Sequence, residues 1–113
     1  MTQLKLTPED LLTGADAAYD VSIPAEVLHP GGGDGSNGHE KVVQLRPLNI
    51  GTFQLILKAA KDDPGMIPLL MIKESLVEPQ MSLPQIKKMH LGLVEFLLAH
   101  VRQISGLTEK KTL

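Results

Sequence analysis

The chain has 113 residues, enough for one domain with a hydrophobic core and too few for two ordinary domains. It contains no cysteine, which excludes disulfide bonds and thiolate metal sites. The formal net charge of −2 and the shortage of aromatic residues argue against a general nucleic-acid binder, which usually has a basic face and rings that stack on bases.

The sequence shows neither a secretory leader nor a membrane span. Residues 1–6 carry a single lysine, and no apolar stretch follows them. The longest apolar-rich segment, residues 91–101, contains Glu95 and His100 and is shorter than the roughly 20 residues that cross a bilayer. We therefore expect a soluble intracellular protein, with no membrane or nucleic-acid partner.

The chain is expected to begin with a short helix and a β-hairpin. Thr7 can cap a helical turn over residues 8–12. Residues 19–28 open with the apolar–polar alternation of a half-buried strand, which is an edge strand or ends at Pro24. Residues 39–48 predict a second strand, and the polar stretch HPGGGDGSNG between the two reads as a hairpin loop.

The second half of the chain predicts helices. Apolar residues share one face of a helix over residues 50–61, which Asn49 can cap. A second helix is expected over residues 66–77. A third is expected over residues 83–105, because Ser82 and Gln85 have the spacing of a capping box.

These elements predict a single α+β domain over residues 1–113. A short helix and a β-hairpin with a Gly-rich loop, residues 1–48, pack on a bundle of about three helices, residues 49–107. Residues 108–113 are expected to form a flexible tail.

The segment GDGSNG, residues 33–38, matches the GxGxxG pattern of dinucleotide-binding loops. Such a loop needs a strand before it and a helix after it, since the helix N-terminus holds the pyrophosphate. Here a strand is expected on both sides. A calcium loop counted from Asp34 also fails, because its twelfth position is Leu45 instead of a glutamate. The segment therefore predicts a hairpin loop, and we expect no cofactor.

The histidines offer one weak candidate for a metal site. His29 and His39 flank the hairpin loop and could form a site with Asp34, although two exposed histidines at strand ends are the simpler interpretation. His90 and His100 would lie about 15 Å apart along one helix, too far to share a metal ion. No arrangement of nucleophile and base is visible, so the sequence predicts neither a metal site nor an enzyme.

The third predicted helix has an unusually wide apolar face. Two apolar stripes run side by side, and only a narrow arc is polar, whereas a surface helix usually has one stripe. Such a helix is either central to the domain or covered by a partner, and the apolar run in the second helix raises the same question. The candidate partner-binding residues are Leu91, Val94, Leu98, Val101, Leu69 and Leu70.

Several short sequence segments occur in a recognisable order along residues 4–107. They are Asp10-Leu11-Leu12-Thr13-Gly14, Tyr19-Asp20-Val21, Val43-Gln44-Leu45-Arg46-Pro47-Leu48, Asp62-Asp63, Glu78-Pro79 with Ser82-Leu83, and Ser105-Gly106-Leu107. In this order the chain resembles the tail assembly chaperones of long-tailed bacteriophages and prophages. The Gly-rich loop is no part of the resemblance.

The resemblance implies a small non-catalytic helper in the cytoplasm of a bacterial host. Members of this family bind the apolar tape-measure protein and keep it soluble until the tail tube polymerises around it. The expected partner is thus the tape-measure protein or another tail protein, with a homo-oligomer as a further expectation. Two alternatives stay open: a structural tail or head component that self-associates, and a small metal-binding protein or enzyme.

Overall fold

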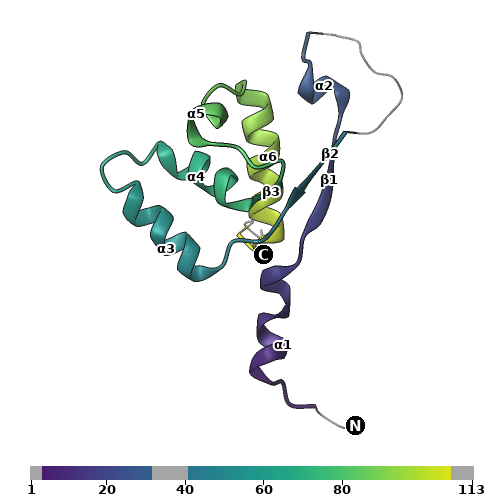
Figure 1. Ribbon diagram of the computed structural model, residues 1–113, viewed down its shortest axis with the longest axis vertical. Helices are drawn as coiled ribbons and strands as arrows, with labels where there is room; N and C mark the ends of the chain where they lie inside the picture. Colours follow the sequence, from purple (N-terminus) through teal and green to yellow (C-terminus); the bar gives the residue numbers. More distant parts are fainter. Residues whose placement is uncertain (1–3, 32–40, 108–113) are drawn as a thin grey trace, which may run out of the picture.

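The computed structural model describes residues 4–31 and 41–107, and it shows an α+β fold (Figure 1). An antiparallel hairpin packs with a group of helices, as the sequence predicts. The elements in chain order are α1 Pro8–Leu12, the 3₁₀ helix η1 Thr13–Asp16, β1 Tyr19–Ile23, α2 Ala25–Leu28, β2 Lys41–Leu45, α3 Ile50–Ala59, α4 Met66–Ser75, β3 Leu76–Glu78, α5 Leu83–Ile86 and α6 Leu91–Ile104.

Helix starts follow the predicted caps. The Thr7 hydroxyl accepts a hydrogen bond from the Asp10 backbone N–H at 3.2 Å, and the Asp10 carboxylate accepts one from the Thr7 N–H at 2.9 Å. Ser82 and Gln85 form the same reciprocal capping box at the start of α5. The Asn49 side chain accepts from Thr52 N–H at 2.8 Å at the start of α3. Each side chain satisfies a backbone donor that the first helical turn leaves unpaired.

The sheet has three antiparallel strands in the order β1-β2-β3. The predicted hairpin is confirmed, with Val21 opposite Val43 in its register. Val21, Ile23 and Leu45 are buried, so the alternation of β1 marks its inward face.

β3 was not expected from the sequence, which predicts helix as far as residue 77. The helix α4 instead ends at Ser75, and Leu76–Glu78 pairs with the end of β2. The pairing has a register shift between Gln44 and Leu45. A strand this short cannot be recognised from periodicity, because its partner lies about thirty residues earlier in the chain.

The single helix predicted over residues 83–105 is wrong. The chain forms α5, a tight turn and then α6, which begins at Leu91. Lys88 N–H and Met89 N–H bond to carbonyls three residues back, and His90 is extended, with φ −73° and ψ 157°. Neither proline nor glycine marks this break, and the apolar period continues across it. The stripes counted from Ile86 therefore do not lie on one helix.

The core lies where α4, α6 and the sheet meet. α4 packs against α6 and α3, and α2 packs against α6 from the hairpin side. The fully buried side chains belong to β2, α4, α5 and α6: Leu45, Ile72, Ser75, Ile86, Leu97 and Val101.

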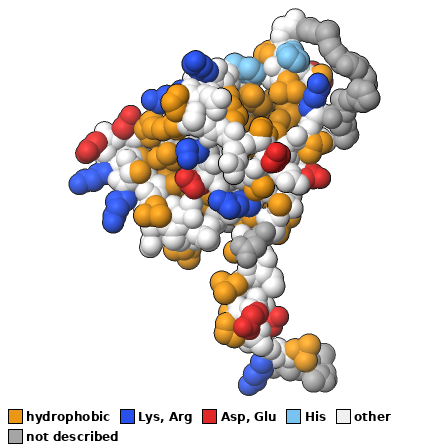
Figure 2. Space-filling model, in the orientation of Figure 1, with side chains coloured by type: hydrophobic (Ala, Val, Ile, Leu, Met, Phe, Trp, Pro, Cys, Tyr) orange, Lys and Arg blue, Asp and Glu red, His pale blue; other side chains and the backbone are white. Residues whose placement is uncertain are grey.

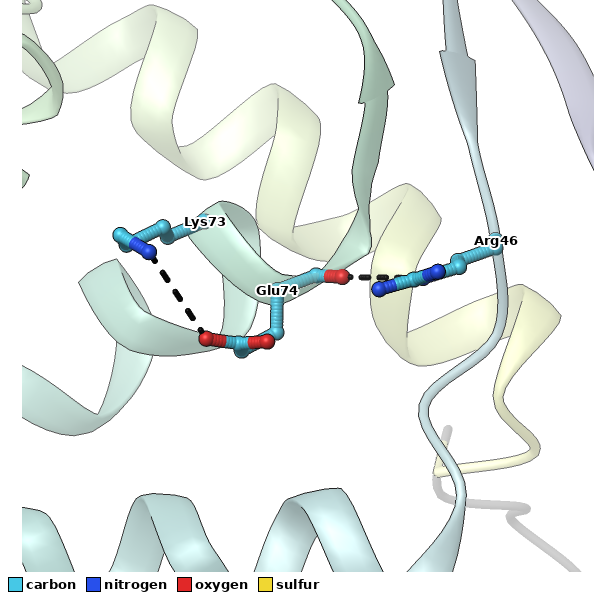
Figure 3. Close-up of polar contacts among 3 residues, drawn as sticks. All are labelled: Arg46, Lys73 and Glu74. Atoms are coloured by element: carbon cyan, nitrogen blue, oxygen red, sulfur yellow. Dashed lines mark hydrogen bonds and ion pairs between the residues drawn. The ribbon is translucent and has the colours of Figure 1, made fainter. Parts of the chain in front are cut away.

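Hydrogen bonds join β2 to the C-terminal end of α4. Arg46 N–H donates to the Ser75 carbonyl at 2.9 Å, and the buried Ser75 hydroxyl donates to the Arg46 carbonyl. The Arg46 guanidinium donates through Nε to the Glu74 carbonyl at 3.2 Å, and Lys73 forms an ion pair with Glu74 at 3.9 Å (Figure 3). This cluster fixes the place where the chain leaves the hairpin and enters the helical part.

The α1 segment extends away from the rest of the domain (Figure 1). None of the residues of α1 is buried, and Leu11 and Leu12 are exposed. Hydrogen bonds of the capping box fix its first turn.

Candidate partner-binding surface

The six predicted partner-binding residues occupy different depths in the structure. Leu91 is 77% exposed, whereas Val94 and Leu98 are half-buried and pack against the core. Leu69 and Leu70 on α4 are also half-buried. These five residues retain surface, and Leu91 retains the most.

Val101 is fully buried and belongs to the core. It faces inward with Leu97, one turn before it, so it has no surface to offer a partner in this conformation. Periodicity placed it in an apolar stripe, and in the structure this position of α6 belongs to the core of the domain.

The outward side of α6 is mixed in character. Leu91, Glu95, Leu98 and Arg102 follow the spacing that places side chains on one helical face. The apolar surface is therefore concentrated near the start of the helix. The wide apolar face that the sequence suggested is largely explained by contacts with α4 and α2 inside the domain.

Two lysines lie directly before this apolar surface. Lys87 and Lys88 occupy the turn between α5 and α6, and both are exposed. Among the residues that the structure describes, the ion pair found is that of Lys73 with Glu74. Neither Lys87 nor Lys88 therefore forms an ion pair with a carboxylate of those residues. We call Lys87, Lys88, Leu91, Val94 and Leu98 the α6 start patch. Figure 2 shows basic and histidine side chains beside hydrophobic ones at the end of the molecule where α2, α5 and α6 meet.

Sequence reasoning missed the role of His90. Its Nδ1 accepts a hydrogen bond from Leu93 N–H at 3.2 Å, so the imidazole caps α6. This bond requires an unprotonated Nδ1. The signal in the sequence was weak, because histidine is less frequent at this position than serine, threonine, aspartate or asparagine.

Other exposed apolar side chains gather on two elements. The first is the N-terminal segment with α1, and the second is α3. The exposed residues there are Leu4, Leu6, Leu11, Leu12, Ile50, Leu55 and Leu57.

The candidate metal site at the hairpin loop is only partly described. His29 is exposed at the C-terminal end of α2, while Asp34, His39 and the GDGSNG segment at 33–38 lie outside the described residues. Across the described residues, no group of three histidine, cysteine, aspartate or glutamate side chains could hold a metal ion. His100 is turned toward its own helix, with Nδ1 3.1 Å from the Phe96 carbonyl oxygen.

The α1 cap perturbs one carboxyl group. The Thr7 backbone N–H, and to a smaller degree the Thr7 hydroxyl, lower the pKa of Asp10 because both stabilise the ionised form. The group is fully exposed and serves the cap, so it suggests no catalytic role.

Residues 4–31 and 41–107 contain no helix with the length and apolarity needed to cross a bilayer. A scan against protein-family models and searches of curated proteins and solved structures found no match to the chain.

Proposed function

We propose that this chain is a non-catalytic tail assembly chaperone of a bacteriophage or prophage, acting in the bacterial cytoplasm on apolar segments of the tape-measure protein. The order of the short sequence segments along residues 4–107 suggests the family. The structural observation that supports the proposal is the exposure of leucine side chains, with Leu91 of the α6 start patch 77% exposed. An exposed leucine beside half-buried apolar neighbours offers surface that a protein partner can cover.

The free energies of leucine burial and of association are consistent with weak, reversible binding of the client. Full burial of an exposed leucine contributes about 1.5–3 kcal/mol. Association costs about 4 kcal/mol or more in lost translational and rotational freedom. One patch centred on Leu91, with Val94 and Leu98 already half-buried, therefore binds weakly on its own. A long client with many apolar segments would be covered by many weak, exchanging contacts, as its later release requires.

The test is co-expression with the tape-measure protein of the same phage genome, followed by measurement of its soluble fraction and by pull-down. Leu91→Asp should lose the protection because a carboxylate cannot be buried against an apolar client. Leu55→Asp, at a site 66% exposed on α3, is the matched control and should keep it. Leu91 is a better site than Leu98 for this change, because Leu98 packs against the core and its replacement would disturb the fold.

An insoluble tape-measure protein in the presence of the native chain, with no complex recovered, would contradict the proposal. Loss of protection in both variants would instead place the client site beyond the α6 start patch.

One observation favours a second candidate, a structural tail or head component that self-associates. The α1 segment has no buried residue and exposes Leu11 and Leu12, as an arm that packs on another copy would. This candidate predicts the protein in purified particles, where a chaperone is absent.

A further inference from the structure

The α6 start patch combines apolar surface with an excess of positive charge. Leu91 is exposed immediately after Lys87 and Lys88, and Val94 and Leu98 extend the apolar surface along the helix. From this combination we infer that the patch binds an amphipathic segment whose apolar side chains are flanked by acidic ones. This inference rests on the proposed function and names the chemistry of the client segment.

The other charges around α6 do not cancel the two lysines. On α6 itself, Glu95 and Arg102 have opposite signs. α4 carries Lys73 and Glu74, which pair with each other at 3.9 Å. On α2, Glu26 is exposed. Among these groups Lys87, Lys88 and Arg102 outnumber Glu26 and Glu95, which leaves an excess of one positive charge. The two lysines directly precede Leu91 in the chain, and Glu95 follows it by one helical turn.

The turn holds the lysines in a defined place. Ile86, fully buried, anchors the end of α5 in the core. Lys87 N–H bonds to the Leu83 carbonyl at 2.9 Å, and Lys88 N–H bonds to the Gln85 carbonyl at 3.1 Å. The His90 cap then starts α6 directly after the turn. The positions of the two ammonium groups relative to Leu91 are therefore restricted by backbone hydrogen bonds, although their side chains stay in water.

Two fluorescein-labelled synthetic helical peptides test the inference. They share the same leucine positions, and the flanking positions are glutamate in one and lysine in the other. Fluorescence anisotropy should show the native chain binding the acidic peptide about three- to tenfold more tightly, as expected for two exposed ion pairs. The difference should shrink in about 1 M salt, where the Debye length falls to about 3 Å.

Charge reversal supplies the matched comparison. Lys87→Glu combined with Lys88→Glu should abolish or invert the preference for the acidic peptide. Lys58→Glu combined with Lys61→Glu changes two exposed lysines at the end of α3 and should leave the preference intact. Equal binding of both peptides to the native chain, or an equal loss in the two variants, would overturn the inference.

A further variant separates apolar docking from attraction by charge alone. Leu91→Asp should weaken binding of both peptides. Undiminished binding of the acidic peptide to this variant, or equally tight binding of a single-stranded oligothymidine to the native chain, would overturn the inference because charge would then suffice.

The tape-measure co-expression assay distinguishes the two levels of the proposal. If the native chain protects the tape-measure protein and the Lys87 and Lys88 reversal protects it equally, the chaperone function stands and the acidic-client inference fails. If the native chain prefers the acidic peptide but gives no protection, the patch stands and the chaperone function fails.

Discussion

Ser75→Ala tests the hydrogen-bonded junction between the hairpin and the helices. The Ser75 hydroxyl is fully buried and donates to the Arg46 carbonyl, and Arg46 N–H returns a bond to the Ser75 carbonyl at 2.9 Å. The substitution deletes the first bond and leaves the second in place. It therefore isolates the contribution of one buried hydroxyl to the docking of β2 on α4.

The expected loss combines two contributions. Deleting the Ser75 hydroxyl leaves the partly buried Arg46 carbonyl without this donor, which costs about 1–3 kcal/mol. Alanine has a better helix propensity than serine, by up to about 0.5 kcal/mol, which offsets a small part at the last residue of α4. The free energy of unfolding should therefore fall by about 1–2.5 kcal/mol, which corresponds to roughly 4 °C in Tm per kcal/mol for a domain of this size.

Urea unfolding followed by circular dichroism measures this loss. Thr13→Ala is the matched control, because the Thr13 hydroxyl also donates to a backbone carbonyl, that of Asp10 at 2.9 Å, but in an exposed segment. It should change the free energy of unfolding by less than about 0.5 kcal/mol. Equal effects of the two substitutions would refute the reasoning, since burial would then add nothing to the Ser75 bond.

Three further predictions concern the core and the helix caps. Leu97→Ala should lower the free energy of unfolding by about 2–5 kcal/mol because it leaves a cavity, whereas Leu91→Ala should change it by less than about 0.5 kcal/mol. Chemical denaturation measures both losses. Similar losses would contradict the burial of Leu97 and the exposure of Leu91. His90→Ala should cost about 0.5–2 kcal/mol by removing the α6 cap, and His90→Asn should restore most of it in thermal melts; a failure of asparagine to do so would count against the capping role. Because the pKa of Asp10 is lowered in the fold, the stabilisation of α1 is present above the ordinary aspartate pKa and lost as the pH falls through the lowered value. An NMR titration of Asp10 in Thr7→Ala should show only part of the shift removed, since the backbone N–H remains, and complete removal would contradict the dominance of that N–H.

The candidate binding residues show what the apolar periodicity of the sequence can predict and what it cannot. The pattern correctly places Leu91, Val94 and Leu98 on the same helix, and all three retain surface. It also includes Val101, which the packing of α6 against the rest of the domain buries completely. An apolar stripe indicates that a face is covered, but it does not indicate whether the cover comes from the same chain or from another.

The sequence by itself determined the local features of the fold, namely the helix caps and the inward face of a strand. The predicted features are the Thr7 cap, the Ser82 capping box, the Asn49 cap and the alternation of β1. Each involves residues within a few positions of one another, and all of them appear in the structure. Short-range hydrogen bonds and side-chain periodicity need no knowledge of the rest of the chain.

Only the tertiary structure decided where helix α4 ends and where the apolar helical pattern after Ser82 is interrupted. α4 gives way to β3 because Leu76 pairs with Leu45, and the apolar period after Ser82 is interrupted at His90 without a proline or glycine. It also decided that Leu91 is exposed and Val101 buried. These outcomes depend on contacts between residues far apart in sequence, such as Ser75 with Arg46. Their free energies exceed the small differences in local propensity that a sequence pattern records.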